Sequence, residues 1–310
     1  MSSIACPVRR ARSLAALNLL ALLSALPAAA AEPTGVLKKI KDSGQITLGY
    51  RESSIPFSYL DDKAEPVGYS IDLCQRVVDA VKAELGLPAL KVARQAVTSQ
   101  NRIPLVVNGT VDLECGSTVN NSERQQQVNF SITSFVVATR FIARKSGNYR
   151  TLDDLKGKTV AVTTGTNTLK RIREINNARN LNLNLVFGKD HAESMLLLTS
   201  GRAEAFFEDD ILLTGMAASS ATPNDFALGT EGLSVDPYAL MFAKGDAPFK
   251  KLVDGSLTGL YRSGEILKIY DRWFMKPIPP KGITLNFPAG ALLKSVITKP
   301  TDSADPADYR

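Results

Sequence analysis

The hydrophobic positions of the chain fall into short apolar runs that alternate with segments of helical spacing. The runs QITLGY at 45–50, LKVAR at 90–94 and VDLEC at 111–115 predict three strands. Between them, apolar residues recur every three or four positions over 69–86, and 101–109 predicts a short helix that ends at a glycine. This order of strands and helices is typical of a parallel sheet covered by helices.

The same order returns later in the chain. KTVAVT, LNLVF and AEAFFED predict three strands within 158–209, and helical spacing follows each of the first two. A further strand is predicted at 238–245, and two helices at 248–262 and 264–275. Because they follow a complete second set of strands, we expect the chain to return here to the first sheet. We therefore predict an α/β protein of two lobes, joined by two strands near 137–141 and 235–239. The predicted bounds are 32–138 plus 238–287 for lobe 1, 139–237 for lobe 2, and 288–310 for a C-terminal tail that we expect to be disordered.

The first residues predict a secretory signal peptide at 1–31. Arg9, Arg10 and Arg12 precede an apolar run that ends in three alanines. The run is short for a membrane span and no second long apolar run follows, so we expect a cleaved, soluble protein of the periplasm. Loss of the signal lowers the formal net charge from +6 to +3. With no long basic run, nucleic acid is not an expected partner.

Cysteine and histidine usage limits the site chemistry. Cys74 and Cys115, the two cysteines of the mature chain, can pair in an oxidising compartment, and they can equally remain free in the core. His191 is the single histidine and there is no CxxC motif, so we expect no metal site. The segment TTGTNT lacks the lysine and the second glycine of a phosphate-binding loop, so we expect no cofactor.

Polar side chains follow the predicted strands of both lobes, where open α/β sheets bind their ligands. One serine or arginine in such a place is usually a helix cap or a solvated side chain. The joint arrangement favours a ligand cleft between the lobes. The set consists of Arg51, Ser99, Arg102, Ser117, Thr163, Thr166, His191 and Asp209.

Four segments then carry a family resemblance. GYRESSIPFSYLDDKAEPVGYSIDL, TSQNRIPL, ECGSTVNNSERQQQVNFS and KDHAESMLLLTSGRAEAFFEDD occur in order across 35–290. They resemble the polar amino-acid solute-binding proteins of ABC importers, in the glutamate/aspartate-binding branch. The resemblance implies a type II periplasmic binding protein fold. It also implies a monomer that closes on L-glutamate or L-aspartate and delivers it to a membrane permease.

The resemblance also implies roles for individual residues. Arg124 clamps the ligand's α-carboxylate, helped by Ser117 and the backbone of Val119, and Asp209 holds the ammonium. Val119 occupies a position where many members have a hydroxyl residue, so only its backbone amide is carried over. The cations for the side-chain carboxylate are Arg51 and Arg102, with Ser99 and His191 nearby, and the TTGTNT loop supplies Thr163, Thr166 and Asn167.

The physical chemistry of an acidic amino acid agrees with these roles. Its two carboxylates and one ammonium lose water in a closed cleft, and an unpaired buried charge is costly. Guanidinium groups suit the carboxylates because they are always charged and bind bidentately. Glutamate and aspartate fit these residues alike.

Two other classes of function are compatible with a two-lobed fold. An enzyme would need a carboxyl or an imidazole poised as acid or base, and the candidates are Glu52, Glu114, Glu208 and His191. None lies in a recognisable catalytic motif, and the excess of arginines favours binding. An amino-acid-sensing receptor domain would normally need a tether.

Overall fold

The computed structural model describes residues 1–6 and 32–309 of the protein. The predicted signal peptide lies outside these residues except for its first six positions. Met1–Glu32 and Pro33–Arg310 are separate units, and the second contains all the helices and strands discussed below. None of the helices in the described part of the chain combines the length and apolar character that a membrane span requires.

Lobe 1 is built on a five-stranded sheet of order β5-β1-β6-β15-β7. The central strand pairs are parallel, β1 with β5 and β1 with β6, whereas β15 is antiparallel to both β6 and β7. The chain thus returns to this sheet after completing the other one. The bounds are β1 Gln45–Tyr50, β5 Lys91–Ala96, β6 Leu113–Glu114, β7 Val128–Phe130 and β15 Met241–Ala243.

Lobe 2 is built on a second five-stranded sheet of order β11-β10-β12-β9-β13. Here β10 is parallel to β11 and β12, while β9 is antiparallel to β12 and β13. The bounds are β9 Thr139–Arg144, β10 Thr159–Thr163, β11 Asn184–Gly188, β12 Ala205–Asp209 and β13 Phe226–Leu228. The predicted two-lobed α/β fold is confirmed.

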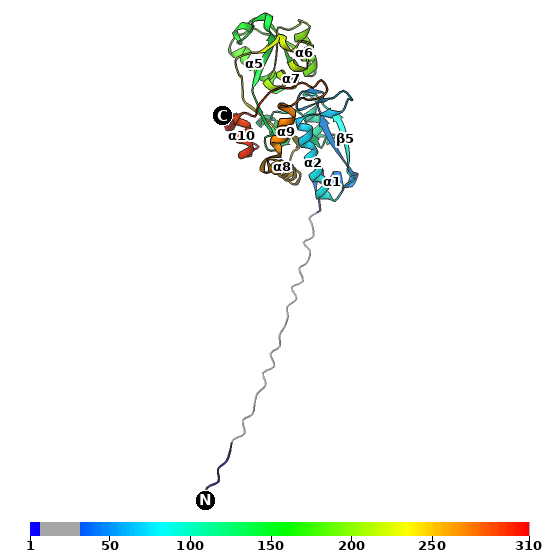
Figure 1. Ribbon diagram of the computed structural model, residues 1–310, viewed down its shortest axis with the longest axis vertical. Helices are drawn as coiled ribbons and strands as arrows, with labels where there is room; N and C mark the ends of the chain where they lie inside the picture. Colours follow the sequence, from blue (N-terminus) through cyan, green and yellow to red (C-terminus); the bar gives the residue numbers. More distant parts are fainter. Residues whose placement is uncertain (7–31, 310) are drawn as a thin grey trace. The chain divides into compact units, whose positions relative to one another are not determined.

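The helices gather around these two sheets. Figure 1 shows α5, α6 and α7 around the sheet of lobe 2, and α1, α2, α8 and α9 with that of lobe 1. Those of lobe 2 are α5 Asn167–Ala178, α6 His191–Thr199 and α7 Asp210–Ser219. Those of lobe 1 are α1 Gly35–Ser43, α2 Tyr69–Leu85, α3 Arg102–Val107, α4 Ser122–Gln125, α8 Ala247–Ser263 and α9 Glu265–Phe274. A small sheet of β2 Ser53–Ser54, β3 Ser58–Leu60 and β4 Pro66–Val67 belongs to lobe 1.

Two short strands form the connection between the lobes. β8 (Phe135–Val137) and β14 (Asp236–Tyr238) pair antiparallel with each other and with no strand of either large sheet among the described residues. They lie close to the predicted crossings. The exact lobe bounds at 138 and 238 stay a prediction.

Aromatic side chains pack beneath these hinge strands. Phe57 lies edge-on to Phe135 of β8 and to Tyr238 of β14, with ring centroids 4.9 and 5.1 Å apart. Phe274 of α9 stacks on Phe135 at 5.0 Å. Such pairs are typically worth about 0.5–1.5 kcal/mol beyond the area they bury. The hinge is therefore anchored in the core of lobe 1.

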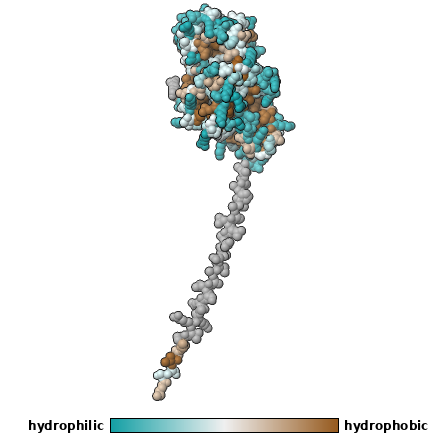
Figure 2. All heavy atoms as spheres, in the orientation of Figure 1, coloured by the Kyte–Doolittle hydropathy of each residue, from teal (hydrophilic) through white to brown (hydrophobic). Residues whose placement is uncertain are grey.

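The surface of the folded unit is ordinary for a globular protein. The face in Figure 2 is largely hydrophilic, with hydrophobic residues scattered over it. Exposed large apolar side chains in this unit lie on four different elements, which is normal for a folded surface. They are Val107, Phe187, Leu196 and Leu267.

The prediction of a disordered C-terminal tail is wrong. Leu293 and Val296 of α10 (Ala291–Thr298) are buried, and Tyr309 is buried near the end of the chain. The Tyr309 hydroxyl lies 2.7 Å from the hydroxyl of Thr133, whose amide donates to the carbonyl of Thr301 at 2.8 Å. The composition of the tail is polar, but three of its apolar or aromatic side chains are buried against the fold, and these hold it in place.

Cys74 of α2 and Cys115 after β6 form a disulfide. Their Cα atoms are 6.1 Å apart, and both side chains are buried. Of the two alternatives that the sequence left open, the structure shows the bridge. It ties the longest helix of the first βαβ unit to the strand that precedes Ser117.

Replacing both Cys74 and Cys115 with serine should lower the free energy of unfolding by about 4 kcal/mol. The bridge spans 41 residues, and closing a loop of that length removes roughly this much entropy from the unfolded chain. Urea denaturation of the mature protein, with and without reductant, measures the effect. The serine variant is the control, because reductant should not change its midpoint. Two alkylated thiols in the unreduced protein would contradict the bridge.

Candidate ligand-binding site

Buried polar atoms without a hydrogen-bond partner concentrate where the strands of both sheets end. Native proteins satisfy nearly all such atoms, so a cluster of them needs an explanation. Most of the cluster consists of donors on arginine and hydroxyl groups. Its members are Nη1 and Nη2 of Arg51, Nε of Arg102, Oγ of Ser99 and Ser117, Nε2 of His191, and one carboxylate oxygen each of Glu114 and Glu208.

Arg51 directly follows β1, and its side chain is 1% exposed. Its amide donates to Ser58 Oγ at 2.8 Å, which fixes the backbone at the end of the strand. Burial lowers the pKa of Arg51 to about 10, and Arg102 lowers it further while Glu114 opposes the shift. The group remains charged at neutral pH.

Arg102 is the first residue of α3 and is 2% exposed. Its Nη1 donates to Thr118 Oγ1 at 2.5 Å and to the Ser117 carbonyl at 3.3 Å. Thr118 in turn donates to Glu114 Oε2 at 2.6 Å. A hydrogen-bonded chain from β6 thus holds the guanidinium and leaves Nε without a partner.

Arg124 lies in α4 and reaches from one lobe to the other. Its Nη1 donates to the Val119 carbonyl at 2.8 Å, and its Nη2 donates to the Gly165 carbonyl of lobe 2 at 3.3 Å. Burial lowers the pKa of Arg124 to about 9, and Arg102 adds to the shift. Asn121 accepts from the Arg124 amide at 2.9 Å and so caps the helix that carries it.

The three arginines share one further property. Among the residues that the structure describes, none of them has a carboxylate oxygen within the 4.0 Å of an ion pair. An isolated charge out of water is normally paired or neutralised. The arrangement therefore has unfilled donors for an organic anion.

Asp209 ends β12 and supplies the opposite charge. Its Oδ1 accepts from Thr139 Oγ1 at 3.1 Å, and its Oδ2 accepts from the hydroxyl of Tyr238 in the hinge strand. Burial raises the pKa of Asp209 well above its usual range, and Glu208 and Asp236 add to the rise. A cation beside this carboxylate would reverse that effect.

His191 and Glu208 form a pair at the base of lobe 2. His191 begins α6, with its Nδ1 3.3 Å from Glu208 Oε2 and 3.2 Å from Thr163 Oγ1. Burial lowers the pKa of His191, which Glu208 partly offsets and Arg51 and Arg102 reinforce. Burial opposes the charge of Glu208, but His191, the Asp209 amide and Thr168 together lower the pKa of that carboxyl.

Two of the predicted lobe 2 residues have partners within the protein. Thr166 caps α5 by accepting from the Leu169 amide at 3.1 Å, and its hydroxyl donates to the Thr163 carbonyl at 2.8 Å. The Asn167 amide donates to Asp236 at 3.3 Å and accepts from Asn121 of lobe 1 at 3.2 Å. These two residues shape the loop and hold the lobes together.

Val119 lies on the hinge side of the site. It forms an isolated antiparallel bridge with Tyr238, and its carbonyl is the acceptor for Arg124 already described. Ser117, two positions earlier, has a buried hydroxyl with no partner. Ser117 and Val119 thus both lie in the segment that follows β6.

Two glycines allow the lobes to touch through their backbones. A Cβ on Gly165 would lie 2.6 Å from the Cα of Gln100, and one on Gly215 would lie 2.6 Å from the Ile55 carbonyl. Gly165 and Gly215 belong to lobe 2, and Gln100 and Ile55 to lobe 1. The lobes therefore meet around the buried arginines.

Sequence reasoning did not assign Thr118 to the site, and it considered Glu114 and Glu208 only as possible acids or bases of an enzyme. The available signal was a pair of acidic residues in each otherwise apolar strand, Asp112 and Glu114 in VDLEC and Glu208 and Asp209 in AFFED. Both glutamates are buried and bound to threonine hydroxyls, Glu114 to Thr118 and Glu208 to Thr168. They are resident counter-charges of the site.

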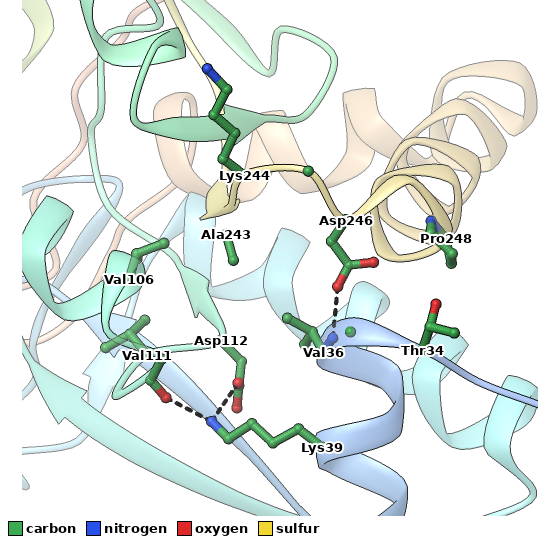
Figure 3. Close-up of a pocket in the computed structure, with 13 residues that line it drawn as sticks. Thr34, Val36, Lys39, Val106, Val111, Asp112, Ala243, Lys244, Asp246 and Pro248 are labelled. Atoms are coloured by element: carbon green, nitrogen blue, oxygen red, sulfur yellow. Dashed lines mark hydrogen bonds and ion pairs between the residues drawn. The ribbon is translucent and has the colours of Figure 1, made fainter.

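A second hollow of about 450 Å³ lies between the start of α1 and the start of α8. Its carboxylates already have protein partners, as Figure 3 shows for Asp246 with the Val36 amide and for Asp112 with Lys39. Asp112 also accepts from the Thr47 amide. The hollow therefore lacks the unfilled donors that mark the site between the lobes.

The fold and the site define a solute-binding protein of the extracellular bacterial type. The chain belongs to the bacterial extracellular solute-binding proteins, family 3, whose model matches residues 46–276.

Named relatives and solved structures agree with this family. The chain is 52% identical to the L-glutamate/L-aspartate-binding protein of Pseudomonas aeruginosa, over 96% of this chain and 99% of that protein. It is 42% identical to the glutamate/aspartate import solute-binding protein of Escherichia coli, over 95% and 97% of the two chains. A mutant of ArgBP from T. maritima has the same fold, with a TM-score of 0.68 at 23% identity, over 77% of this chain and 99% of its own.

Proposed function

We propose that this protein is a periplasmic binding protein that captures L-glutamate or L-aspartate between its lobes and delivers it to the permease of an ABC importer. The observation that carries the proposal is the group of three buried guanidiniums without a carboxylate partner. Two relatives that match nearly their whole length are named for binding or importing these two amino acids. The protein acts as a monomer, with its signal peptide removed.

The α-amino acid group of the ligand lies near the hinge in this proposal. Arg124 binds the α-carboxylate, with the Ser117 hydroxyl and the Val119 amide beside it. Asp209 binds the ammonium, which takes the place of the proton that burial favours on this carboxyl. Because Tyr238 donates to Asp209 from β14, ammonium binding acts directly on a hinge strand.

The side-chain carboxylate of the ligand lies against the other two arginines. Arg51 offers Nη1 and Nη2, Arg102 offers Nε, and Ser99 offers a buried hydroxyl, all without partners in the described protein. A carboxylate provides about four acceptor sites, which suits such a set of donors. His191 is assigned to the same end of the ligand, beside the side-chain carboxylate.

Unfilled donors, rather than a net positive charge, select the acidic ligand. Glu114, Glu208, Asp209 and Asp236 are buried with the three arginines, so carboxyl groups outnumber guanidinium groups by four to three in this region. These carboxylates, however, accept from hydroxyl or amide groups of the protein, among them Thr118, Thr168, Tyr238 and Asn167. The arginine donors remain for the ligand.

An enzyme on the same fold is the second class of function considered. Glu114, Glu208 and His191 lie in the site, but the hydroxyl network holds both glutamates. The close relatives are named as binding proteins.

Calorimetry of the untagged mature protein against the common L-amino acids tests the proposed function. We expect saturable binding of glutamate and aspartate, with the ligand recovered unchanged. Tighter binding of a neutral or basic amino acid would overturn the ligand assignment. Chemical conversion of the bound amino acid would instead favour an enzyme.

Arg124→Ala and Asp209→Ala should each weaken glutamate binding by two to three powers of ten. Removing one partner of a buried charge pair costs roughly 3–5 kcal/mol, and about 1.4 kcal/mol corresponds to tenfold. Titration calorimetry measures the change. The exposed Arg150→Ala is the control and should bind normally. Near-normal affinity in either site variant would refute the role assigned to that residue.

Arg102→Met should remove most of the discrimination between glutamate and glutamine. A charge-assisted hydrogen bond contributes roughly 1.5–3 kcal/mol, and glutamine loses it while bringing donors toward arginines. Affinity for glutamate should fall far more than affinity for glutamine. The matched control is Arg94→Met, an exposed arginine of β5 paired with Glu65. An unchanged ratio of the two affinities would show that Arg102 does not read the ligand's side chain.

Gly215→Ala should weaken ligand binding. Alanine is favoured over glycine in a helix interior by about 1 kcal/mol, but its Cβ would lie 2.6 Å from the Ile55 carbonyl of the opposite lobe. We expect at least about tenfold weaker binding, since overpacking costs roughly 1–3 kcal/mol. Gly255→Ala in α8 is the control, because an added Cβ there meets nothing within 4 Å. Equal affinities in the two variants would argue against closure through this contact.

A further inference from the structure

The protonation state of His191 is determined by a network within lobe 2. Ser194 Oγ donates to the Asp190 carbonyl at 3.0 Å, which uses its only proton. The hydroxyl of Thr163, 2.8 Å from Ser194 Oγ, must then be the donor in that contact. Since its proton is also used, Thr163 can only accept from Nδ1 of His191, 3.2 Å away.

Glu208 imposes the same condition from the other side. Its Oε2 lies 3.3 Å from Nδ1 of His191, and a carboxylate oxygen is an acceptor. Its Oε1 is held by the Thr168 hydroxyl and the Asp209 amide, both at 3.2 Å. Both neighbours of Nδ1 therefore offer it only acceptor atoms, so Nδ1 carries a proton. A neutral ring then has a bare lone pair at Nε2.

The bare nitrogen belongs to the buried cluster that has no partners. Nε2 of His191 is buried without a hydrogen-bond partner, as are Nη1 and Nη2 of Arg51 and Nε of Arg102. Both arginines act electrostatically on the ring. Nε2 points away from Thr163 and Glu208, because the two ring nitrogens have divergent directions. A lone pair there would repel the carboxylate that the arginines attract.

We propose that His191 binds the ligand's anion only as an imidazolium, so that capture of an acidic amino acid takes up one proton from solution at Nε2. The proposal rests on the proposed function and deepens it. The proton converts Nε2 from an acceptor into a third donor for the side-chain carboxylate. Glu208 then has the imidazolium as its counter-charge, which makes it a positioning residue for the ligand.

Charge balance favours the same outcome. A dicarboxylic amino acid brings a net charge of minus one into a region where four buried carboxyl groups already face three arginines. The charged groups that act on His191 from the elements packed against it are Glu208 of β12, Arg51 ahead of β2, and Arg102 of α3. Asp190 caps its own helix. A proton on the ring offsets the added negative charge.

The sign of the pH dependence follows from the shift of the ring on binding. The ring is disposed to be neutral without ligand, because burial lowers the pKa of His191. The bound carboxylate favours the charged form and raises that pKa. Between the two values, the contribution of His191 to glutamate affinity should fall as pH rises, by up to about tenfold for each pH unit because one proton is linked at this ring.

Nuclear magnetic resonance of His191 tests the proposal directly. The chain contains a single histidine, so protein labelled with ¹⁵N-histidine and freed of any histidine tag gives one imidazole signal set. At about pH 8, where an ordinary imidazole with a pKa of about 6.5 is neutral, we expect one protonated nitrogen without ligand. With saturating L-glutamate we expect two. A bound ring that stays neutral, with its proton on either nitrogen, would overturn the proposal.

Glu208→Gln provides a second measurement. Glutamine keeps the shape of Glu208 but has no negative charge to stabilise an imidazolium, so the bound variant should keep one protonated nitrogen. Its affinity should lose the dependence on pH that is assigned to His191. Two protonated nitrogens in the bound variant would show that Glu208 does not determine the state of the ring. If the wild type fails to bind glutamate in calorimetry, the proposed function fails. Binding with a neutral ring overturns this inference alone.

Discussion

Keeping three guanidinium groups out of water without a carboxylate beside them is the constraint on which the rest of this structure depends. Solvation of such a group is worth several kcal/mol, and the protein replaces it only in part. Arg102 and Arg124 donate to backbone carbonyls and a threonine, whereas both terminal nitrogens of Arg51 have no partner in the described protein. The remaining demand for acceptors gives an anionic ligand its binding energy.

The resident carboxylates make this arrangement tolerable. Glu114 and Glu208 lie near enough to stabilise the charge on Arg51, yet their hydrogen bonds go to threonines. If they paired directly with the arginines, they would compete with the ligand for the same donors. A counter-charge held just beyond ion-pair distance keeps the arginines ionised and available.

The sequence predicted the architecture well because strand, helix and turn signals are local. The polar residues after the strands were found for the same reason, since the edge of a parallel sheet places them together. Asp209 was among these residues, whereas Arg124 needed the family resemblance, because nothing local distinguishes an arginine in a four-residue helix from a solvated one. Both lie in the site that the structure describes.

The rest depended on contacts between residues far apart in the chain. Asn167 bonds to Asn121 and Asp236, which lie 46 and 69 positions away, and periodicity cannot identify such partners. The tail looked disordered because its composition is polar, and Tyr309 is buried against residues more than 170 positions earlier. The tautomer of His191 emerges only from the directions of four hydrogen bonds.

The order of the strands has a consequence for synthesis and export. Every strand of the lobe 2 sheet comes from one continuous stretch between residues 139 and 228. The lobe 1 sheet needs β15, and the turn that carries Arg124 is braced by the last residues through Asn120 and Asp302. Closing so long an intervening segment has an entropic cost that a local sheet avoids. As the chain emerges N-terminus first, we expect the inserted lobe to mature early, while the lobe that begins the sequence is completed only by its final residues.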